Sequence, residues 1–291
     1  MTEGEAAPAA AAEPGSRNLL LRVVVALVLA PLAIAIAYAG GWLWAGLVTL
    51  GAIGLYVEWL TIVGAAGEMR VVASGVVALG VAGFCLATGR IDAALVVFVA
   101  GLIVVALITP ARRNWTATGF FYAAAAEIAS VLVRLDSVKG FAALILVLLV
   151  VWVTDIGGYF AGRGIGGPKL WPRVSPKKTW AGAIGGFVAS LIVAAGFYAF
   201  DHNQAAEHSL KLELGPLLVL GAMLSVVSQL GDLFESAVKR RFGVKDSSHI
   251  IPGHGGLLDR LDGFVAAVVM AAIFGFLRRG ADGVGSGLMV W

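Results

Sequence analysis

The length of the uncharged apolar segments constrains this chain more than any other feature. No residue of 23–57 is charged, although one helix needs only about 20 apolar residues to cross a bilayer. Gly40 and Gly41, in the middle of this segment, indicate a turn between two helices. A helix on the surface of a soluble protein carries a polar face, which most of these segments lack. The mean hydropathy of +0.92 agrees, so the sequence predicts an integral membrane protein.

Further apolar segments follow along the chain. Uncharged segments cover 71–89, 93–111, 140–154, 179–200, 214–231 and 263–277, and a weaker one at 116–133 contains Glu127. We therefore expect an all-α, polytopic membrane protein with about nine transmembrane helices.

Composition outlines the domain organisation. Residues 1–16 are rich in Ala, Pro and Gly, which predicts a disordered tail, and they lack the basic start of a signal peptide, so we expect the tail to be retained. N-terminal transmembrane helices are expected over 17–136, a C-terminal catalytic region over 137–278 and a short tail over 279–291. The single cysteine, Cys85, excludes a disulfide framework within the chain.

Basic residues near the helix ends predict the orientation. The segments 161–178 and 239–245 are strongly basic, and with nine spans and a cytoplasmic N-terminus both face the cytoplasm. Arg278 and Arg279 then lie outside, against the rule. We expect a polar, cytoplasm-facing pocket where the two basic segments meet.

Acidic residues fall at the ends of three predicted helices. They are Asp155 in one helix, Asp232 and Glu235 in a second, and Asp259 and Asp262 in a third. The three-residue spacing within each pair places both carboxylates on one helix face. Carboxylates at the membrane edge are costly unless they pair with basic side chains or bind a metal, and both alternatives are open.

The metal alternative has chemical support in the neighbouring residues. Two carboxylates from different helices beside a basic rim suit Mg²⁺, which takes its other ligands from water and phosphates. Lys177 and Lys178 supply positive charge, and Gly255 and Gly256 allow backbone amides to approach an anion. His254 is either a phosphate ligand, a general base or a structural hydrogen-bonding residue. Together these residues indicate a polyanion pocket suited to phosphoryl or nucleotidyl transfer. No P-loop motif occurs, so a standard soluble nucleotide-binding fold is not expected.

The segment 236–262 carries a specific pattern. It reads S-x-x-K-R-x₄-K-D-x-S-x₂-I-P-x-H-G-G-x₂-D-R-x-D and resembles the signature of the phosphatidate cytidylyltransferases, also called CDP-diacylglycerol synthases. The stretches "DIGGYFAGRGIGGPKLWPRVSPKKTWAGAIGG" and "SQLGDLFES" are similar to two others of that family. The resemblance is close from Asp155 to Asp262, and the first half matches only as a series of membrane helices.

This resemblance implies an activity and a setting. Members of the family convert phosphatidate and CTP into CDP-diacylglycerol and pyrophosphate with a divalent metal. For this chain it implies Mg²⁺, with a second cation left open, a bilayer-embedded enzyme of a bacterial inner membrane that acts on the cytoplasmic side, and a homodimer. No nucleic acid is expected as a partner.

The resemblance and the polar pattern together assign roles to residues. Catalytic roles are expected for Asp232, Asp259, Lys239 and Arg260; metal binding for Asp232, Asp259 and Asp262; and substrate binding for Asp155, Ser175, Lys177, Lys178, Ser236, Arg240, Lys245, Asp246, His254, Gly255 and Gly256. Ala181 stands where many relatives have Glu or Gln, and Gly167-Pro168 where they often have a basic residue, so no role is carried over to these positions.

Three alternatives remain beside this interpretation. A membrane kinase that uses CTP to phosphorylate a polyprenol or phytol would release CDP, and the full 236–262 pattern argues against it. A CDP-alcohol phosphatidyltransferase would need DGxxAR, which "LDGFVAAVV" lacks. A transporter would place charge near the middle of the membrane, whereas these charges gather toward one side.

Overall fold

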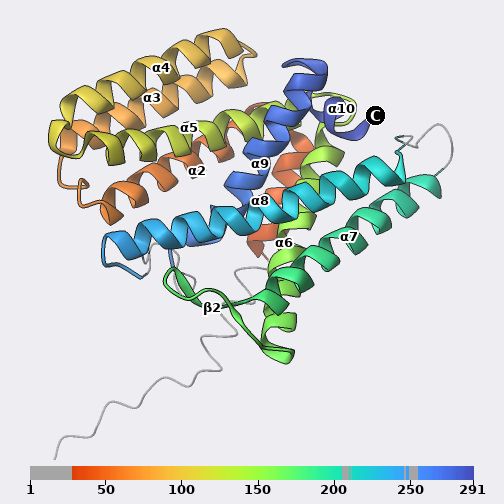
Figure 1. The fold of residues 1–291 in the computed structure, drawn as a ribbon. Helices are drawn as coiled ribbons and strands as arrows, with labels where there is room; N and C mark the ends of the chain where they lie inside the picture. The colour runs from red at the N-terminus through yellow and green to blue at the C-terminus, as the bar shows by residue number, and fades with distance from the viewer. Residues whose placement is uncertain (1–27, 205–209, 211, 246, 249–254) are drawn as a thin grey trace, which may run out of the picture.

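The protein is a bundle of long helices in a computed structural model (Figure 1), which describes residues 28–204, 210, 212–245, 247–248 and 255–291. The predicted tail 1–16 lies outside these residues. The elements are α2 (Gly41–Ile62), α3 (Met69–Ala87), α4 (Ile91–Ile108), η1 (Pro110–Arg112), α5 (Arg113–Leu135), α6 (Gly140–Gly164), β1 (Lys169–Trp171), β2 (Ser175–Thr179), α7 (Trp180–His202), α8 (Leu214–Arg241), α9 (Leu258–Arg279) and α10 (Val284–Met289). The predicted all-α membrane class is confirmed.

Eight helices of the described chain are long and apolar enough to cross a membrane. They include α5, the helix expected at the weak segment that contains Glu127. The first of the nine expected spans corresponds to a shorter apolar helix, Val28–Ala39, which begins where the description of the chain begins. The predicted tail 279–291 contains the short helix α10, whose residues Val284, Leu288 and Met289 are buried.

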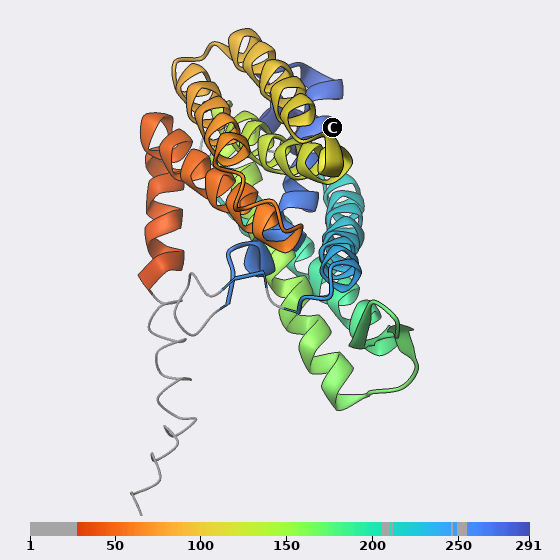
Figure 2. The ribbon, with the colours of Figure 1, turned by 90° about the vertical axis from the view of Figure 1, so that its left-hand side faces the viewer.

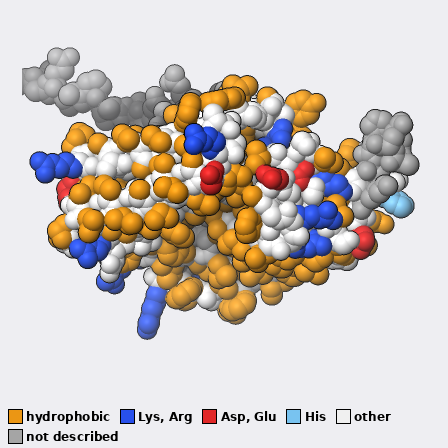
Figure 3. All heavy atoms as spheres, turned by 90° about the horizontal axis from the view of Figure 1, so that it is seen from above, with side chains coloured by type: hydrophobic (Ala, Val, Ile, Leu, Met, Phe, Trp, Pro, Cys, Tyr) orange, Lys and Arg blue, Asp and Glu red, His pale blue; other side chains and the backbone are white. Residues whose placement is uncertain are grey.

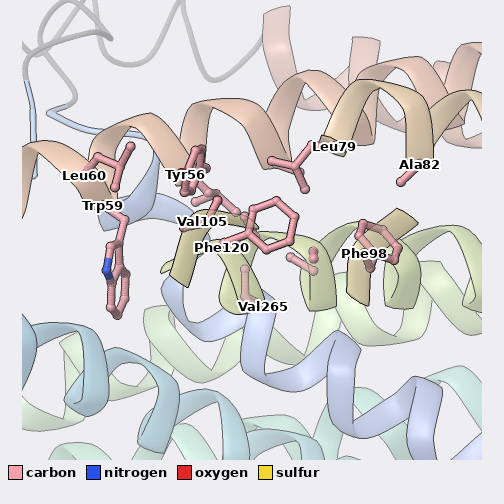
Figure 4. Close-up of a cluster of buried hydrophobic side chains, with 14 of the residues drawn as sticks. Tyr56, Trp59, Leu60, Leu79, Ala82, Phe98, Val105, Phe120 and Val265 are labelled. Atoms are coloured by element: carbon pink, nitrogen blue, oxygen red, sulfur yellow. The ribbon is translucent and has the colours of Figure 1, made fainter. Parts of the chain in front are cut away.

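Two clusters of buried apolar side chains form the interior. The first joins α2, α3, α4 and α5 around Tyr56, Trp59 and Phe120 (Figure 4). The second joins α5, α6, α8, α9 and α10. Helices α5 and α9 contribute to both clusters, and Val265 of α9 lies in the first of them. Residues from either side of position 136 therefore pack together, and the predicted boundary there stays a prediction.

Outside these clusters the helices present apolar side chains. Hydrophobic side chains cover much of the face shown in Figure 3, with Lys, Arg, Asp and Glu side chains among them and a group of basic ones on the right. Val96, Val99 and Leu107 of α4 are examples of exposed large apolar residues. Such a surface is unusual for a soluble monomer and is expected where lipid tails surround the protein.

Glycines allow the helices that carry the acidic residues to approach closely. A Cβ atom at Gly231 of α8 would lie 2.5 Å from the Cβ of Ala266 and 2.7 Å from the backbone oxygen of Asp262, both on α9. A Cβ atom at Gly263 would lie 2.6 Å from Ser228 Oγ. Small residues are typical of helix contacts within membranes. The α8–α9 contact brings together the ends of both helices that carry the predicted site.

A short hairpin connects α6 to α7. Strands β1 and β2 pair antiparallel, with Lys169 opposite Thr179 and Trp171 opposite Ser175. In Figure 2 the hairpin lies at the lower end of the molecule, away from α3 and α4. Thr179 then begins α7 as its N-cap, because its Oγ1 accepts a hydrogen bond of 3.1 Å from the backbone N–H of Gly182. The hairpin is the small departure from all-helical structure in the described chain.

Candidate active site

A polar cavity of about 530 Å³ lies between α6, α7, α8 and the hairpin. Its charged and polar lining includes Asp155, Tyr159 and Arg163 of α6, Lys177 and Lys178 of β2, and Gln229 and Asp232 of α8. Four of the residues predicted to bind substrate or metal, Asp155, Lys177, Lys178 and Asp232, thus meet in one cavity.

Lys178 and Asp232 form an ion pair across this cavity, from β2 to α8. Their side chains are 28% and 29% exposed, so water still reaches the pair. Ser236 Oγ lies one helical turn away, 3.4 Å from Asp232 Oδ1. Arg240 Nε donates to the backbone oxygen of Val174 at 3.3 Å, which ties the hairpin to the end of α8. The hairpin therefore carries its lysines to the carboxylates of the membrane helices.

Asp262 of α9 does not line this cavity, but it is close enough to interact electrostatically with Asp232, Asp155 and Lys178. The negative charges of Asp232 and Asp155 repel a negative charge on Asp262, whereas the positive charge of Lys178 attracts it. Three carboxylates from three helices thus share one positive neighbour. Such repulsion is relieved by protonation, by further basic groups or by a cation.

A second charged cluster lies on the neighbouring turns of α8 and α9. Lys239 Nζ is 2.5 Å from Asp259 Oδ1 and 2.7 Å from Glu235 Oε2. Asp259 Oδ2 accepts hydrogen bonds from the backbone N–H of Ser247 at 3.1 Å, from Ser247 Oγ at 3.0 Å and from the N–H of Gly256 at 3.1 Å. Gly255, with φ of 83°, adopts the left-handed conformation that favours glycine just before these contacts. Asp259 is therefore held by four donors.

The residues present fit a hard divalent cation by their donor chemistry. Carboxylates of Asp155, Asp232 and Asp262 gather beside lysines, and Mg²⁺ needs only one or two protein carboxylates when phosphates supply the rest. Within the described residues, no group of three or more His, Cys, Asp or Glu side chains is already arranged as a metal cage. Both oxygens of Asp259 are occupied by donors of the protein, so its predicted metal role stays a prediction.

The remaining predicted residues lie around these two clusters. Ser175 begins β2, while Arg240, Lys245 and Arg260 are exposed on the ends of α8 and α9 and the loop between them. Asp246 and His254 lie outside the described residues.

Sequence reasoning missed Glu58, near the end of α2. Its side chain is fully buried and its two oxygens accept hydrogen bonds from Ser247, Ser248, Leu257 and Leu258, all within the 236–262 pattern. The one available signal was a lone carboxylate directly after a long uncharged segment.

Comparison with known proteins agrees with the site. Residues 20–277 match the Cytidylyltransferase family. A phosphatidate cytidylyltransferase of Brucella suis is 45% identical over 179 residues, which are 58% of this chain and 60% of that protein. Proteins of the same name from Haemophilus influenzae and Staphylococcus haemolyticus are 43% identical over 141 residues and 50% identical over 123 residues. These alignments cover 48% of this chain and 48% of the first protein, and 42% and 44% for the second.

The matched region thus spans about 60% or less of the length of these relatives. The family match is much longer, since it extends from before α2 to the end of α9 and contains every element that lines the cavity. The chain belongs to the Cytidylyltransferase family.

Proposed function

We propose that this protein is a phosphatidate cytidylyltransferase, which transfers the cytidylyl group of CTP to phosphatidate and yields CDP-diacylglycerol and pyrophosphate. The observation that carries the proposal is the cavity in which Asp155 and Asp232 of membrane helices meet Lys177 and Lys178 of the hairpin. Acidic and basic groups at the end of a helix bundle suit two phosphate-bearing substrates, one from the bilayer and one from water. The names of the relatives support the same activity.

The reaction requires one bond to form and one to break. A phosphate oxygen of phosphatidate attacks the α-phosphorus of CTP, and the bond from that phosphorus to the oxygen bridging to the β-phosphorus breaks. Pyrophosphate leaves with the electron pair. Because the nucleophile is already an anion, the protein needs no strong general base. Its tasks are to position two anions and to neutralise their charge.

The residues of the cavity divide these tasks. Lys177 and Lys178 lie on β2 where they can bind phosphate oxygens, and Arg163 faces the same cavity from α6. Arg163 Nη1 donates to Tyr159 Oη at 2.7 Å, which orients the guanidinium. Lys239 supplies one positive charge to the two carboxylates of the neighbouring cluster, Asp259 and Glu235. These contacts favour ordered binding of charged groups over passage of a solute.

Asp232 and Asp262 are the residues that would hold Mg²⁺, with Asp155 facing the same cavity and Asp259 one turn before Asp262 on α9. The cation would supply neutralisation of phosphate charge when bound. A second cation would be bound by the same carboxylates. Removal of divalent cations with EDTA is expected to abolish the reaction, and added Mg²⁺ to restore it.

The position of the cavity at one end of the helices suggests how each substrate reaches it and which side of the membrane it faces. The acyl chains of phosphatidate remain in the bilayer while its phosphate enters from the side, and CTP enters from water. We propose that this end faces the cytoplasm of a bacterial inner membrane, because the basic hairpin lies there. We also propose that the protein forms a homodimer.

The test is a transfer assay in detergent with phosphatidate, CTP labelled at the α-phosphorus and Mg²⁺. Label is expected to enter the lipid phase with release of pyrophosphate. Asp232→Asn is expected to abolish the transfer. The matched control is Asp92→Asn, since Asp92 is an exposed aspartate in the first turn of α4 and does not line the cavity.

Other outcomes of this assay distinguish the alternatives. Label that remains in soluble CDP while an alcohol is phosphorylated would identify a kinase. Folded protein that produces neither labelled lipid nor a phosphorylated alcohol would contradict the proposal and favour the transporter alternative. Loss of activity in Asp92→Asn to the same extent as in Asp232→Asn would remove the assigned role of the cavity.

A further inference from the structure

Glu58 connects the N-terminal helices to the segment that carries the second charged cluster. It lies on α2, four residues before the end of that helix, and does not line the polar cavity. Its side chain is 0% exposed although it belongs to an otherwise apolar helix. A buried carboxylate is costly unless hydrogen bonds compensate for the loss of water. The hydrogen-bond donors to Glu58 therefore indicate its structural role.

Four donors converge on this carboxylate. Ser248 Oγ at 2.6 Å and the backbone N–H of Leu257 at 2.8 Å donate to Oε1. Ser247 Oγ at 2.9 Å and the N–H of Leu258 at 2.8 Å donate to Oε2. Two donors come from the loop after α8 and two from the start of α9. One side chain thus ties the loop after α8 to the start of α9.

Ser247 extends this contact to Asp259. Its Oγ lies 2.9 Å from Glu58 Oε2 and 3.0 Å from Asp259 Oδ2, so its single hydrogen is shared between the two carboxylates. Asp259 in turn holds Lys239 at 2.5 Å. The order of contacts is Glu58, Ser247, Asp259 and Lys239, from the N-terminal helices to α8.

Space around the loop is also restricted at this point. A Cβ atom at Gly256 would lie 1.8 Å from Ser247 Oγ and 2.7 Å from Glu58 Oε2. The backbone therefore lies against the carboxylate with no room for another side chain. A small displacement of the loop would break several of these hydrogen bonds together.

We propose that Glu58 is a positioning residue: through Ser247 and the start of α9 it sets the place of Asp259 and Lys239 for cytidylyl transfer. This inference rests on the function proposed above. Glu58 does not touch the reacting groups, and its effect reaches them through the hydrogen bonds of the loop. The N-terminal helices thereby contribute to catalysis as well as to the membrane anchor.

The test compares Glu58→Gln with Glu127→Gln. Glu127 of α5 is also 0% exposed and accepts a hydrogen bond of 2.7 Å from Thr49, which like Glu58 is on α2. An amide at position 58 turns two donor hydrogens toward donors of the loop. We expect kcat to fall about 10- to 100-fold in Glu58→Gln, with the KM for CTP changed less than about twofold, and little change in Glu127→Gln.

A double-mutant cycle separates positioning from general destabilisation. If Glu58 acts through Ser247, then Glu58→Gln and Ser247→Ala are expected to lower kcat together by less than the product of their single effects. Hydrogen exchange of the Leu257 and Leu258 amides is expected to rise in Glu58→Gln and to stay unchanged in Glu127→Gln. Losses that simply multiply would overturn the proposal.

Ser248→Ala is the second variant in case Glu58→Gln does not fold, since it removes a single donor to Glu58. A several-fold fall in kcat with an unchanged melting temperature is expected, and an unchanged kcat would overturn the inference. Wild-type protein without transfer activity would instead contradict the proposed function. An active wild type, an inactive Asp232→Asn and a fully active Glu58→Gln would leave the function intact and remove the role of Glu58.

Discussion

At the scale of single residues, the site depends on ion pairs whose partners could not be predicted from the sequence pattern. Lys178 was predicted to bind phosphate, and the structure adds that it pairs with Asp232 of α8. The spacing of Asp232 and Glu235 predicted a shared helix face, yet Asp232 lines the cavity whereas Glu235 pairs with Lys239. Neighbours on one face thus belong to two clusters, because the hairpin and α9 cover different parts of that face.

Removal of the Lys178 charge is the first prediction at this scale. Lys178→Met would leave Asp232, Asp155 and Asp262 without their shared positive neighbour and the phosphates without a ligand. We expect kcat/KM for CTP to fall about 100- to 1,000-fold in the transfer assay. Lys169→Met is the matched control, because Lys169 is an exposed lysine of the same hairpin that does not line the cavity. Equal losses in both variants would contradict the assignment.

Asp136 gives a prediction on pH, and it lies in the connection between α5 and α6. Burial alone would raise the pKa of Asp136, but hydrogen bonds from Ser286, Lys139 and Val138 outweigh burial and hold its pKa below the ordinary value. The ionised form therefore stabilises the fold at pH values above the unfolded pKa of about 3.9. That contribution is lost as the pH falls from about 4 through the lower, folded pKa.

The measurement is the melting temperature of wild type and Asp136→Asn between pH 7 and pH 3. At pH 7 the free energy of unfolding of the variant is expected to be about 1–3 kcal/mol lower, since Asn keeps one acceptor oxygen and turns its NH2 group toward either the Ser286 N–H or those of Val138 and Lys139. The difference between the two proteins should shrink as the solution becomes more acidic than pH 4. A difference that is constant over the whole range would show that charge is not involved.

At the scale of elements, the contact between α8 and α9 decides where the carboxylates meet. Gly231 and Gly263 allow the two helices to touch with backbone near backbone. This approach places Asp262 beside Asp232 although the two lie on different helices. The contact between α8 and α9 is stabilised by close packing and not by removal of apolar surface from water, because lipid tails are themselves apolar.

Gly231→Ala tests this contact. The added methyl group would lie 2.5 Å from the Cβ of Ala266, so the helices must separate, at a cost of about 1–3 kcal/mol. We expect a lower melting temperature and a reduced kcat, since Asp262 moves away from Asp232. Gly215→Ala is the control on the same helix, because nothing lies within 4 Å of a Cβ atom there. A fully active Gly231→Ala would show that the close approach is not required.

The sequence predicted most elements and fewer of their contacts. Long uncharged segments directly indicate helices that lipid can surround, so the class and the weak span at α5 were predictable. The hairpin was not predicted, because its three- and five-residue strands have exposed, charged residues and no apolar alternation. Glu58 could not be assigned either, since its partners lie 189 to 200 residues further along the chain. Contacts of that range depend on how helices pack, which periodicity within one helix does not specify.

At the scale of the whole molecule, α5 and α9 make the two apolar clusters one unit. Each of these helices contributes buried residues to both clusters, and α9 also begins with the carboxylates of the site. A loss of packing in either cluster should therefore disturb the other. The site is accordingly expected to be lost with the whole fold and not with one half of it.

Thiol labelling during denaturation measures this cooperativity. Cys85 packs against the first cluster, and Ala272→Cys places a second thiol in the other. We expect both thiols to become reactive over the same range of denaturant, as for one cooperative transition. A thiol at position 272 that reacts well before Cys85, in a protein whose melting temperature matches that of the wild type, would show two separate units.

The contacts of Glu58 also have a consequence in time. The ribosome makes α2 long before it makes Ser247 and the start of α9, some 190 to 200 residues later. Until those residues are made, the Glu58 carboxylate lacks all four of its hydrogen-bond donors. The hydrogen bonds that compensate for burial of the Glu58 carboxylate can therefore form only after α8 and the start of α9 have been synthesised.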